Sequence, residues 1–291
     1  MARKKSWFSL FLCYLLWGFQ PLYWSITDSI DSFTILGVRI IMAALFSLVL
    51  LSLQHRLHDL KAVFHDKQTL KFLLPAVLFL LLDWGVFIAA VNAGHVLDTS
   101  LGYYISPLLL FAVGALVYRE HCSRVQLCAI AVAAVGVLVS AVAFGSVPYI
   151  SLIIASNWAI YASIKKNVHL DGVVSIAAET LLLTPLAVIF LLCFRSAELA
   201  SLTGGEIVFL LGSGIVTALP MYLYTDSIRA FPLILMSFSQ YLSPTFNMCC
   251  GLLLGESFSQ SQRSSLLFFL AAIGIFTAGE VRQLKKSASD I

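Results

Sequence analysis

The sequence predicts an all-α integral membrane protein with ten transmembrane helices, arranged as two inverted repeats of five helices each. Composition, the distribution of charge over the loops and a repeated motif lead to this fold class. Of the 291 residues, 60% are hydrophobic and 11% are charged, whereas about 25% of the residues in an ordinary soluble domain are charged. So few charged residues cannot cover the surface of a water-soluble globule.

Apolar stretches recur along the whole chain, and each contains about 20 residues, enough for a helix to cross a hydrocarbon core of roughly 30 Å. Because lipid offers no partner to a free backbone amide, each stretch is expected to be helical. The first run begins at Trp7 after a basic start, but no small-residue cleavage site follows it, so we expect a retained helix rather than a signal peptide. The expected helices are 7–26, 33–53, 70–91, 97–117, 124–143, 148–164, 173–194, 205–228, 233–254 and 264–282.

Basic residues are distributed unevenly between the loops on the two sides of the expected bundle. The outer loops contain only Arg195 and Arg263, and nearly all other lysines and arginines fall on the side of the N-terminus, including Lys165 and Lys166. This asymmetry predicts that both termini are cytoplasmic, in the inner membrane of a bacterial cell. The net charge of +3 therefore indicates membrane topology, and no nucleic-acid partner is expected.

A repeated motif indicates that the chain consists of two related halves. The segment Ser100-Leu-Gly-Tyr-Tyr-Ile-Ser-Pro107 aligns with Ser237-Phe-Ser-Gln-Tyr-Leu-Ser-Pro244. Each half contains five expected helices, and because five is odd, the second half must insert upside down relative to the first. We therefore expect one compact membrane unit made of repeats 1–143 and 144–291.

Three ionisable residues fall deep within the expected helices: Arg39, Asp83 and Glu179. A charge at such a depth costs about 2.5 to 3.5 kcal/mol on insertion scales, so each residue suggests a function. Arg39 and Asp83 share a depth, which predicts an ion pair or a shared water between them. Glu179 falls near the position equivalent to Arg39 in the second repeat. These charges could bind substrate or a proton or act at gates, or they could be buried pairs that only determine helix packing.

Aromatic and polar residues gather near the midplane of several expected helices, and a solute pocket needs such amphipathic walls. Each of them could equally serve in packing, and Trp7, Tyr23 and Trp24 near helix ends favour an interfacial belt. Pro107 and Pro244 lie inside helices at matched positions, as static kinks or as hinges. The candidate substrate-binding residues are Trp17, Gln20, Arg39, Asp83, Trp84, Tyr103, Tyr104, Asn157, Trp158, Tyr161, Glu179, Gln240 and Tyr241.

These features favour a secondary-active or facilitative transporter that moves a small metabolite or drug-like solute by alternating access. No motif of a metalloprotease or serine hydrolase is present, which disfavours the alternative of an intramembrane lipid-modifying enzyme. A non-transporting membrane scaffold is the other alternative, and the internal duplication disfavours it. The six cysteines show no metal-ligand spacing, so neither a metal nor a cofactor is expected. A coupling proton and the oligomeric state stay open.

Several motifs resemble those of the RarD family of EamA-type transporters, in the drug/metabolite transporter superfamily. The resemblance extends from about residue 10 to residue 280. It implies a ten-helix inverted-repeat carrier with a central cavity. It also implies that Arg39 corresponds to the basic residue of a His-Arg pair, with Val38 in place of the histidine, and that Asp83 stands where asparagine is usual. The matching motifs include Tyr14-Leu-Leu-Trp17-Gly18-Phe-Gln-Pro21-Leu-Tyr23-Trp24, Glu179-Thr-Leu-Leu-Leu, Val216-Thr-Ala-Leu-Pro220 and Gln240-Tyr-Leu-Ser-Pro244-Thr.

Overall fold

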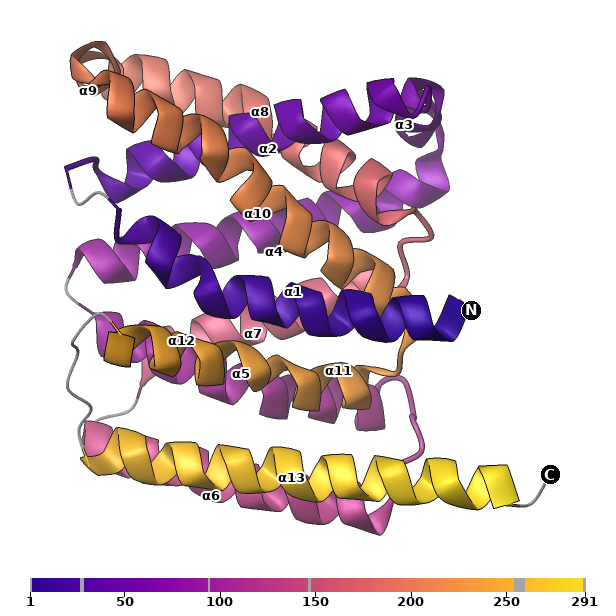
Figure 1. Cartoon of the computed structure of the whole chain (residues 1–291). Coiled ribbons are helices and arrows are strands. Elements are labelled where there is room, and N and C mark those ends of the chain that lie inside the picture. The colour runs from indigo at the N-terminus through magenta and orange to yellow at the C-terminus, as the bar shows by residue number, and fades with distance from the viewer. Residues whose placement is uncertain (1, 27–28, 94, 146–147, 254–259, 290–291) are drawn as a thin grey trace.

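The computed structural model describes residues 2–26, 29–93, 95–145, 148–253 and 260–289, and within these ranges it contains helices and no strands (Figure 1). Six helices, α2, α4, α5, α6, α8 and α10, are long and apolar enough to cross a membrane. The protein is therefore an all-α, multi-pass membrane protein. The helices are α1 Ala2–Trp24, α2 Ser32–Leu53, α3 Leu57–His65, α4 Lys67–Asn92, α5 Val96–Leu116, α6 Arg124–Phe144, α7 Tyr149–Lys166, α8 Gly172–Phe194, α9 Ser196–Ser201, α10 Gly204–Ala230, α11 Leu233–Gln240, α12 Leu242–Leu253 and α13 Gln260–Ser289.

The apolar windows of the sequence coincide with long helices, apart from the window 233–254. There the helix is divided into α11 and α12 at Tyr241. Pro244 gives the physical reason, because a proline cannot donate to the carbonyl four residues earlier and its ring clashes with that carbonyl. Pro107 has no such effect, and α5 continues through it. Whether either proline acts as a hinge stays a prediction.

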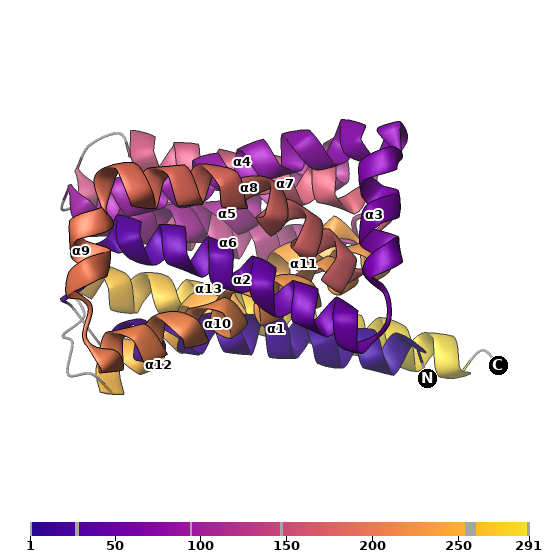
Figure 2. The same cartoon turned by 90° about the horizontal axis from the view of Figure 1, so that it is seen from above.

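Two short helices connect the long ones and were not expected from the sequence. α3 lies across the end of the bundle that carries both termini (Figure 2), where Leu60 and Val63 are buried. α9 lies at the opposite end. Neither segment has the length of a membrane span, so a search for long apolar windows cannot detect it.

The long helices pack in pairs that recur between the two halves of the chain. α1 packs against α10 and α12, as α7 packs against α4 and α5. α2 packs against α8, and α6 packs against α13, which places these two pairs on opposite sides of the bundle (Figure 1). Both termini lie at the same end of the bundle, as Figure 1 also shows.

Helices α2 and α8 are joined by one ion pair at each end. At the end with the termini, Arg56 follows α2 and lies 2.9 Å from Asp171, the residue that caps the N-terminus of α8. At the opposite end, Arg195 follows α8 and lies 3.0 Å from Asp31, which caps the N-terminus of α2. We call Arg56–Asp171 and Arg195–Asp31 the two end ion pairs.

A second carboxylate supports each end ion pair. Asp59 accepts a hydrogen bond of 2.7 Å from Nε of Arg56. The hydrogen bond to Asp171, followed by that to Asp59, raises the pKa of Arg56. Glu198 takes the corresponding place at the other end, where it accepts from the backbone amide of Asp31 at 2.7 Å and from the hydroxyl of Thr34. Both ends of the α2–α8 pair are thus held at the same time.

Gly214 marks the close contact between α2 and α10. A Cβ atom added at Gly214 would lie 2.4 Å from the backbone oxygen of Met42. We expect Gly214→Ala to lower stability by about 1 to 3 kcal/mol, because a backbone cannot yield as a side chain can. The measurement is the melting temperature of the purified protein in detergent.

Gly274 provides the matched control for this prediction. No atom lies within 4 Å of a Cβ added there. Gly274→Ala should therefore melt at or slightly above the wild-type temperature, because alanine favours helix more than glycine does. Equal melting temperatures for the two variants would contradict the close packing of α2 on α10.

Candidate functional site

A cavity of about 230 Å³ lies at mid-height in the bundle, between α1, α2, α4, α5, α7, α10 and the α11–α12 pair. The structure places in its wall the predicted residues Trp17, Gln20, Arg39, Asp83, Trp84, Tyr103, Trp158, Gln240 and Pro244. The sequence reasoning did not select the lining residues Tyr14, Pro21, Trp24, Phe87, Thr217, Met221, Ser243 and Asn247. The position of Trp24 near a helix end favours the interfacial belt instead.

The cavity extends toward the end of the bundle opposite the termini. On α1 its wall runs from Tyr14, at the middle of the helix, to Trp24, at the last residue. Toward the termini the bundle is closed, because Tyr161, Tyr224 and Phe238 are fully buried there in the largest apolar cluster. The cavity therefore lies nearer the end opposite the termini, and packed aromatic side chains lie between it and the other end.

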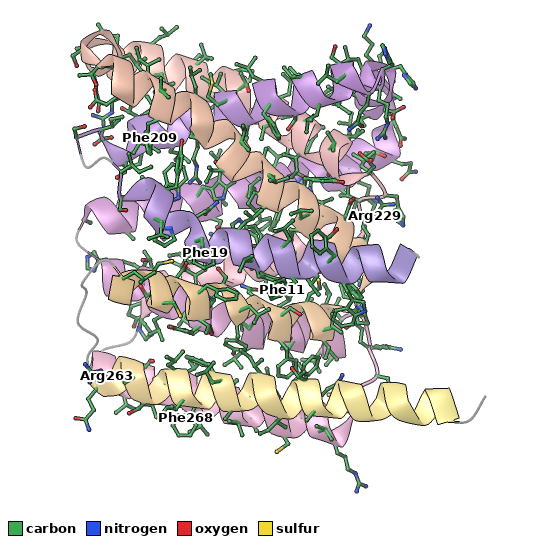
Figure 3. The ribbon with its side chains drawn as sticks, in the orientation of Figure 1. Phe11, Phe19, Phe209, Arg229, Arg263 and Phe268 are labelled. Carbon is green, nitrogen blue, oxygen red and sulfur yellow. The ribbon has the colours of Figure 1, made fainter. Side chains whose placement is uncertain are left out.

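The side wall between α1 and α12 is tightly packed. Phe11 and Phe19, both labelled on α1 in Figure 3, contact Phe246 of α12, with ring centroids 6.4 and 5.6 Å away. Gly18 allows this approach, since an added Cβ would lie 2.3 Å from the Cβ of Phe246. The wall therefore separates the cavity from the outside of the bundle.

The guanidinium side chain of Arg39 and the carboxyl side chain of Asp83 both lie in the wall of this cavity. The Cζ atom of Arg39 lies 4.6 Å from the ring centroid of Trp84 and 5.9 Å from that of Trp24. Asp83 is only 2% exposed. Within the described part of the chain no ion pair joins them, and Nε of Arg39 and Oδ1 of Asp83 have no hydrogen-bond partner. The direct ion pair predicted between these residues is therefore absent.

Other polar atoms of the wall are also unpartnered. Of the seven buried side-chain atoms without a partner among the described residues, five belong to lining residues. Besides Arg39 and Asp83, these are Nε1 of Trp158, Oγ1 of Thr217 and Oε1 of Gln240. Each such group costs about 1 to 3 kcal/mol when it stays unpaired. A polar solute or water in the cavity would recover that energy.

Gln20 differs from these groups, because its side chain is held in place. Its Nε2 donates to the backbone oxygen of Val216 at 2.8 Å. This bond joins α1 to α10 at the wall of the cavity. Gln20 therefore contributes a fixed amide oxygen to the lining.

Glu179 lies outside the cavity, in a fully buried ion pair with Lys165. The hydroxyl of Tyr161 donates to Oε2 of Glu179 at 3.1 Å, and Nζ of Lys165 donates to the hydroxyl of Ser175 at 2.8 Å. The sequence pattern predicts that Lys165 lies in a cytoplasmic loop. That assignment was wrong, because α7 continues to Lys166 and Lys165 is 0% exposed.

Three further candidates pack away from the cavity. Tyr104 stacks on Phe269 of α13, with ring centroids 4.4 Å apart. Tyr241 also stacks on Phe269, at 5.1 Å, and its hydroxyl donates to the backbone oxygen of Tyr104 at 3.4 Å. Asn157 is buried on α7 but does not line the cavity. A role of these residues in binding stays untested.

No group of three histidine, cysteine, aspartate or glutamate side chains in the described ranges is arranged to hold a metal ion. The cavity wall presents a guanidinium, a carboxyl group, neutral hydrogen-bonding groups and aromatic faces. Such a wall can bind and orient a small polar molecule.

Comparisons with known proteins find relatives that are EamA-like transporters or RarD proteins. Residues 5–142 match the model of the EamA-like transporter family. The chain is 32% identical to an uncharacterized transporter, YojE, of Bacillus subtilis, with 98% of both chains covered. It is 32% identical to the protein RarD of Streptomyces exfoliatus, covering 95% of this chain and 89% of that one. It is also 28% identical to RarD of Escherichia coli, covering 94% of each.

A solved crystal structure has the same fold. Its TM-score is 0.73, and the match covers 96% of this chain and 99% of the other, at 14% sequence identity. At this level of identity the likeness concerns the arrangement of helices alone.

Proposed function

Because the chain belongs to the RarD family of EamA-like transporters, within the drug/metabolite transporter superfamily, we propose that it carries a small metabolite or drug-like solute across the membrane by alternating access. One observation supports this most strongly. The bundle contains a cavity with unpaired polar groups that lies nearer one end, with packed aromatic side chains between it and the other end. This is the arrangement expected of a carrier with one gate open.

The proposed architecture has ten spans in two inverted repeats, 1–143 and 144–291. The recurring helix pairs and the two end ion pairs support it, since an internal two-fold relation would exchange them. The common location of the termini and the positive charge of the loops around them favour a bacterial inner membrane with both termini cytoplasmic. In that orientation the cavity faces the periplasm. Proton coupling and the oligomeric state are properties to be measured on the reconstituted protein.

Transport in proteoliposomes tests the proposal. The purified full chain is reconstituted and offered amino acids, nucleotides and antibiotics, with and without a pH gradient. We expect saturable uptake of at least one class, above the level of protein-free vesicles, and stimulation by the gradient would identify proton coupling. If no class moves while the vesicle lipid becomes chemically altered, the protein is an enzyme and the transport proposal fails.

A further inference from the structure

One face of α4 carries a row of exposed side chains that begins with two lysines and continues with leucines. Spacings of three and four residues place all members of the row on one side of the helix. The α4 row consists of Lys67, Lys71, Leu74, Leu78 and Leu82. The opposite face of the helix packs into the bundle, where Leu73, Ala76 and Leu80 are at most 1% exposed. The α4 row therefore faces outward.

The length of the α4 row matches one leaflet of a membrane. α4 is long and apolar enough to span a membrane, so its exposed leucines contact lipid acyl chains. With a rise of about 1.5 Å per residue, Leu82 lies roughly 16 Å from Lys71 along the helix axis, which is about half of a hydrocarbon core of roughly 30 Å. The two lysines therefore lie at the level of the lipid headgroups. They belong to the end of the bundle that carries the termini, where α3 leads into α4 (Figure 2).

Lys67 and Lys71 are neighbours on the helix surface, and no carboxylate pairs with them. Residues four apart on a helix have Cβ atoms about 5 to 6 Å apart, and like charges at this spacing repel each other. Neither lysine belongs to an ion pair among the residues that the structure describes. The carboxylate of Asp66 instead accepts from the backbone amides of Gln68 and Thr69, at 3.0 and 3.3 Å. An anion in contact with both ammonium groups would remove the repulsion.

We propose that the α4 row binds an anionic glycerophospholipid of the leaflet on the side of the termini, with the phosphate between Lys67 and Lys71 and an acyl chain along the leucines. A lysine ammonium is a compact positive charge that suits phosphate oxygens. A zwitterionic lipid suits the row less well, because its own cationic group would lie beside the two lysines. This inference requires the protein to be embedded in a membrane and does not depend on transport.

The test compares two lipids on the purified full chain in detergent. Phosphatidylglycerol and phosphatidylcholine with the same acyl chains are added as mixed micelles, so that only the headgroup differs. Binding is measured by native mass spectrometry and by the rise in melting temperature that a ligand of the native state produces. A basic residue near an anionic lipid surface contributes about fivefold in affinity, so wild-type protein should prefer phosphatidylglycerol by about tenfold or more. High salt should reduce this preference in the melting measurement, because surface charges are screened.

The double variant Lys67→Gln with Lys71→Gln tests the assignment of the headgroup site, and its preference for phosphatidylglycerol should largely disappear. Lys61→Gln is the matched control, because it removes an exposed lysine at the same end of the bundle, on α3 and outside the α4 row. It should keep the wild-type preference. The double variant Lys67→Arg with Lys71→Arg keeps both charges and should also keep the preference, which would exclude a general loss of structure as the cause.

Several results would overturn the inference. Equal affinity of wild-type protein for the two lipids would show that the lysines do not select an anionic headgroup. An unchanged preference in the glutamine double variant, or an equal loss in Lys61→Gln, would show that no specific site lies on the α4 row. Inorganic phosphate at millimolar concentration distinguishes a lipid from a soluble anion. If phosphate raises the melting temperature as much as phosphatidylglycerol does, and only when both lysines are present, the ligand is a soluble anion and the lipid assignment is wrong.

Discussion

Replacement of Lys165 by methionine is expected to deplete the folded protein from the membrane, and replacement of Lys165 and Glu179 together by apolar residues is expected to restore it. Both side chains are 0% exposed and form an ion pair. When one partner of such a pair is removed, an uncompensated buried charge remains, at a cost of about 3 to 5 kcal/mol. When both are replaced by apolar residues of similar volume, the change is often neutral or stabilising.

The measurements are membrane abundance and the melting temperature in detergent for Lys165→Met and for the double variant Lys165→Met with Glu179→Leu. Lys61→Met is the control, because Lys61 is exposed on α3 and its replacement should change stability by about 0.5 kcal/mol or less. If Lys165→Met is as abundant and stable as wild type but inactive, the pair serves transport rather than folding. If the double variant is no better than the single one, the pairing itself is wrong.

Arg39→Ala is expected to have the opposite pattern, with normal abundance and a large loss of solute binding. None of the ion pairs among the described residues includes Arg39, and its Nε has no hydrogen-bond partner there, so its replacement breaks no ion pair. A hydrogen bond to a charged group contributes about 1.5 to 3 kcal/mol, which corresponds to a loss of roughly tenfold to more than a hundredfold in affinity. Arg39→Lys keeps the charge but cannot form bidentate hydrogen bonds, so its affinity for the solute should lie between those of wild type and Arg39→Ala.

The experiment compares solute uptake in proteoliposomes with membrane abundance for the two Arg39 variants and wild type. Transport that falls while abundance is unchanged supports a role in binding. Should Arg39→Ala instead disappear from the membrane as Lys165→Met is expected to, Arg39 stabilises the helix packing and does not bind solute.

Much of the fold could be predicted from the sequence, because the cost of burying a backbone in lipid makes long apolar windows helical. The ends of those windows were less certain, and Lys165 shows the consequence. Two adjacent lysines after an apolar run look like a loop, but neighbours on a helix point about 100° apart. Lys165 therefore turns inward to Glu179 while Lys166 lies partly exposed, with Nζ donating to the backbone oxygen of Phe231 at 2.7 Å.

The cavity could be predicted only in part, for a related reason. Position along a helix gives the depth of a residue, whereas its direction around the helix axis depends on the neighbouring helices. Arg39 and Asp83 were found because charge at depth is costly. Tyr104 shares the depth of Tyr103 but faces α13, where it stacks on Phe269. Trp24, near the end of its helix, has the position of a belt residue but lies beside Arg39 instead.

The simultaneous presence of the two end ion pairs has a consequence for movement during transport. Because an ion pair joins α2 to α8 at both ends in one and the same conformation, we expect these two helices to move together as one unit. Under the alternating access proposed above, the other helices would then move relative to the α2–α8 pair. Arg39, on α2, would stay with the α2–α8 pair, while Asp83, on α4, would move relative to it. The distance between Arg39 and Asp83 would therefore change in each transport cycle, and the affinity for a bound solute would change with it.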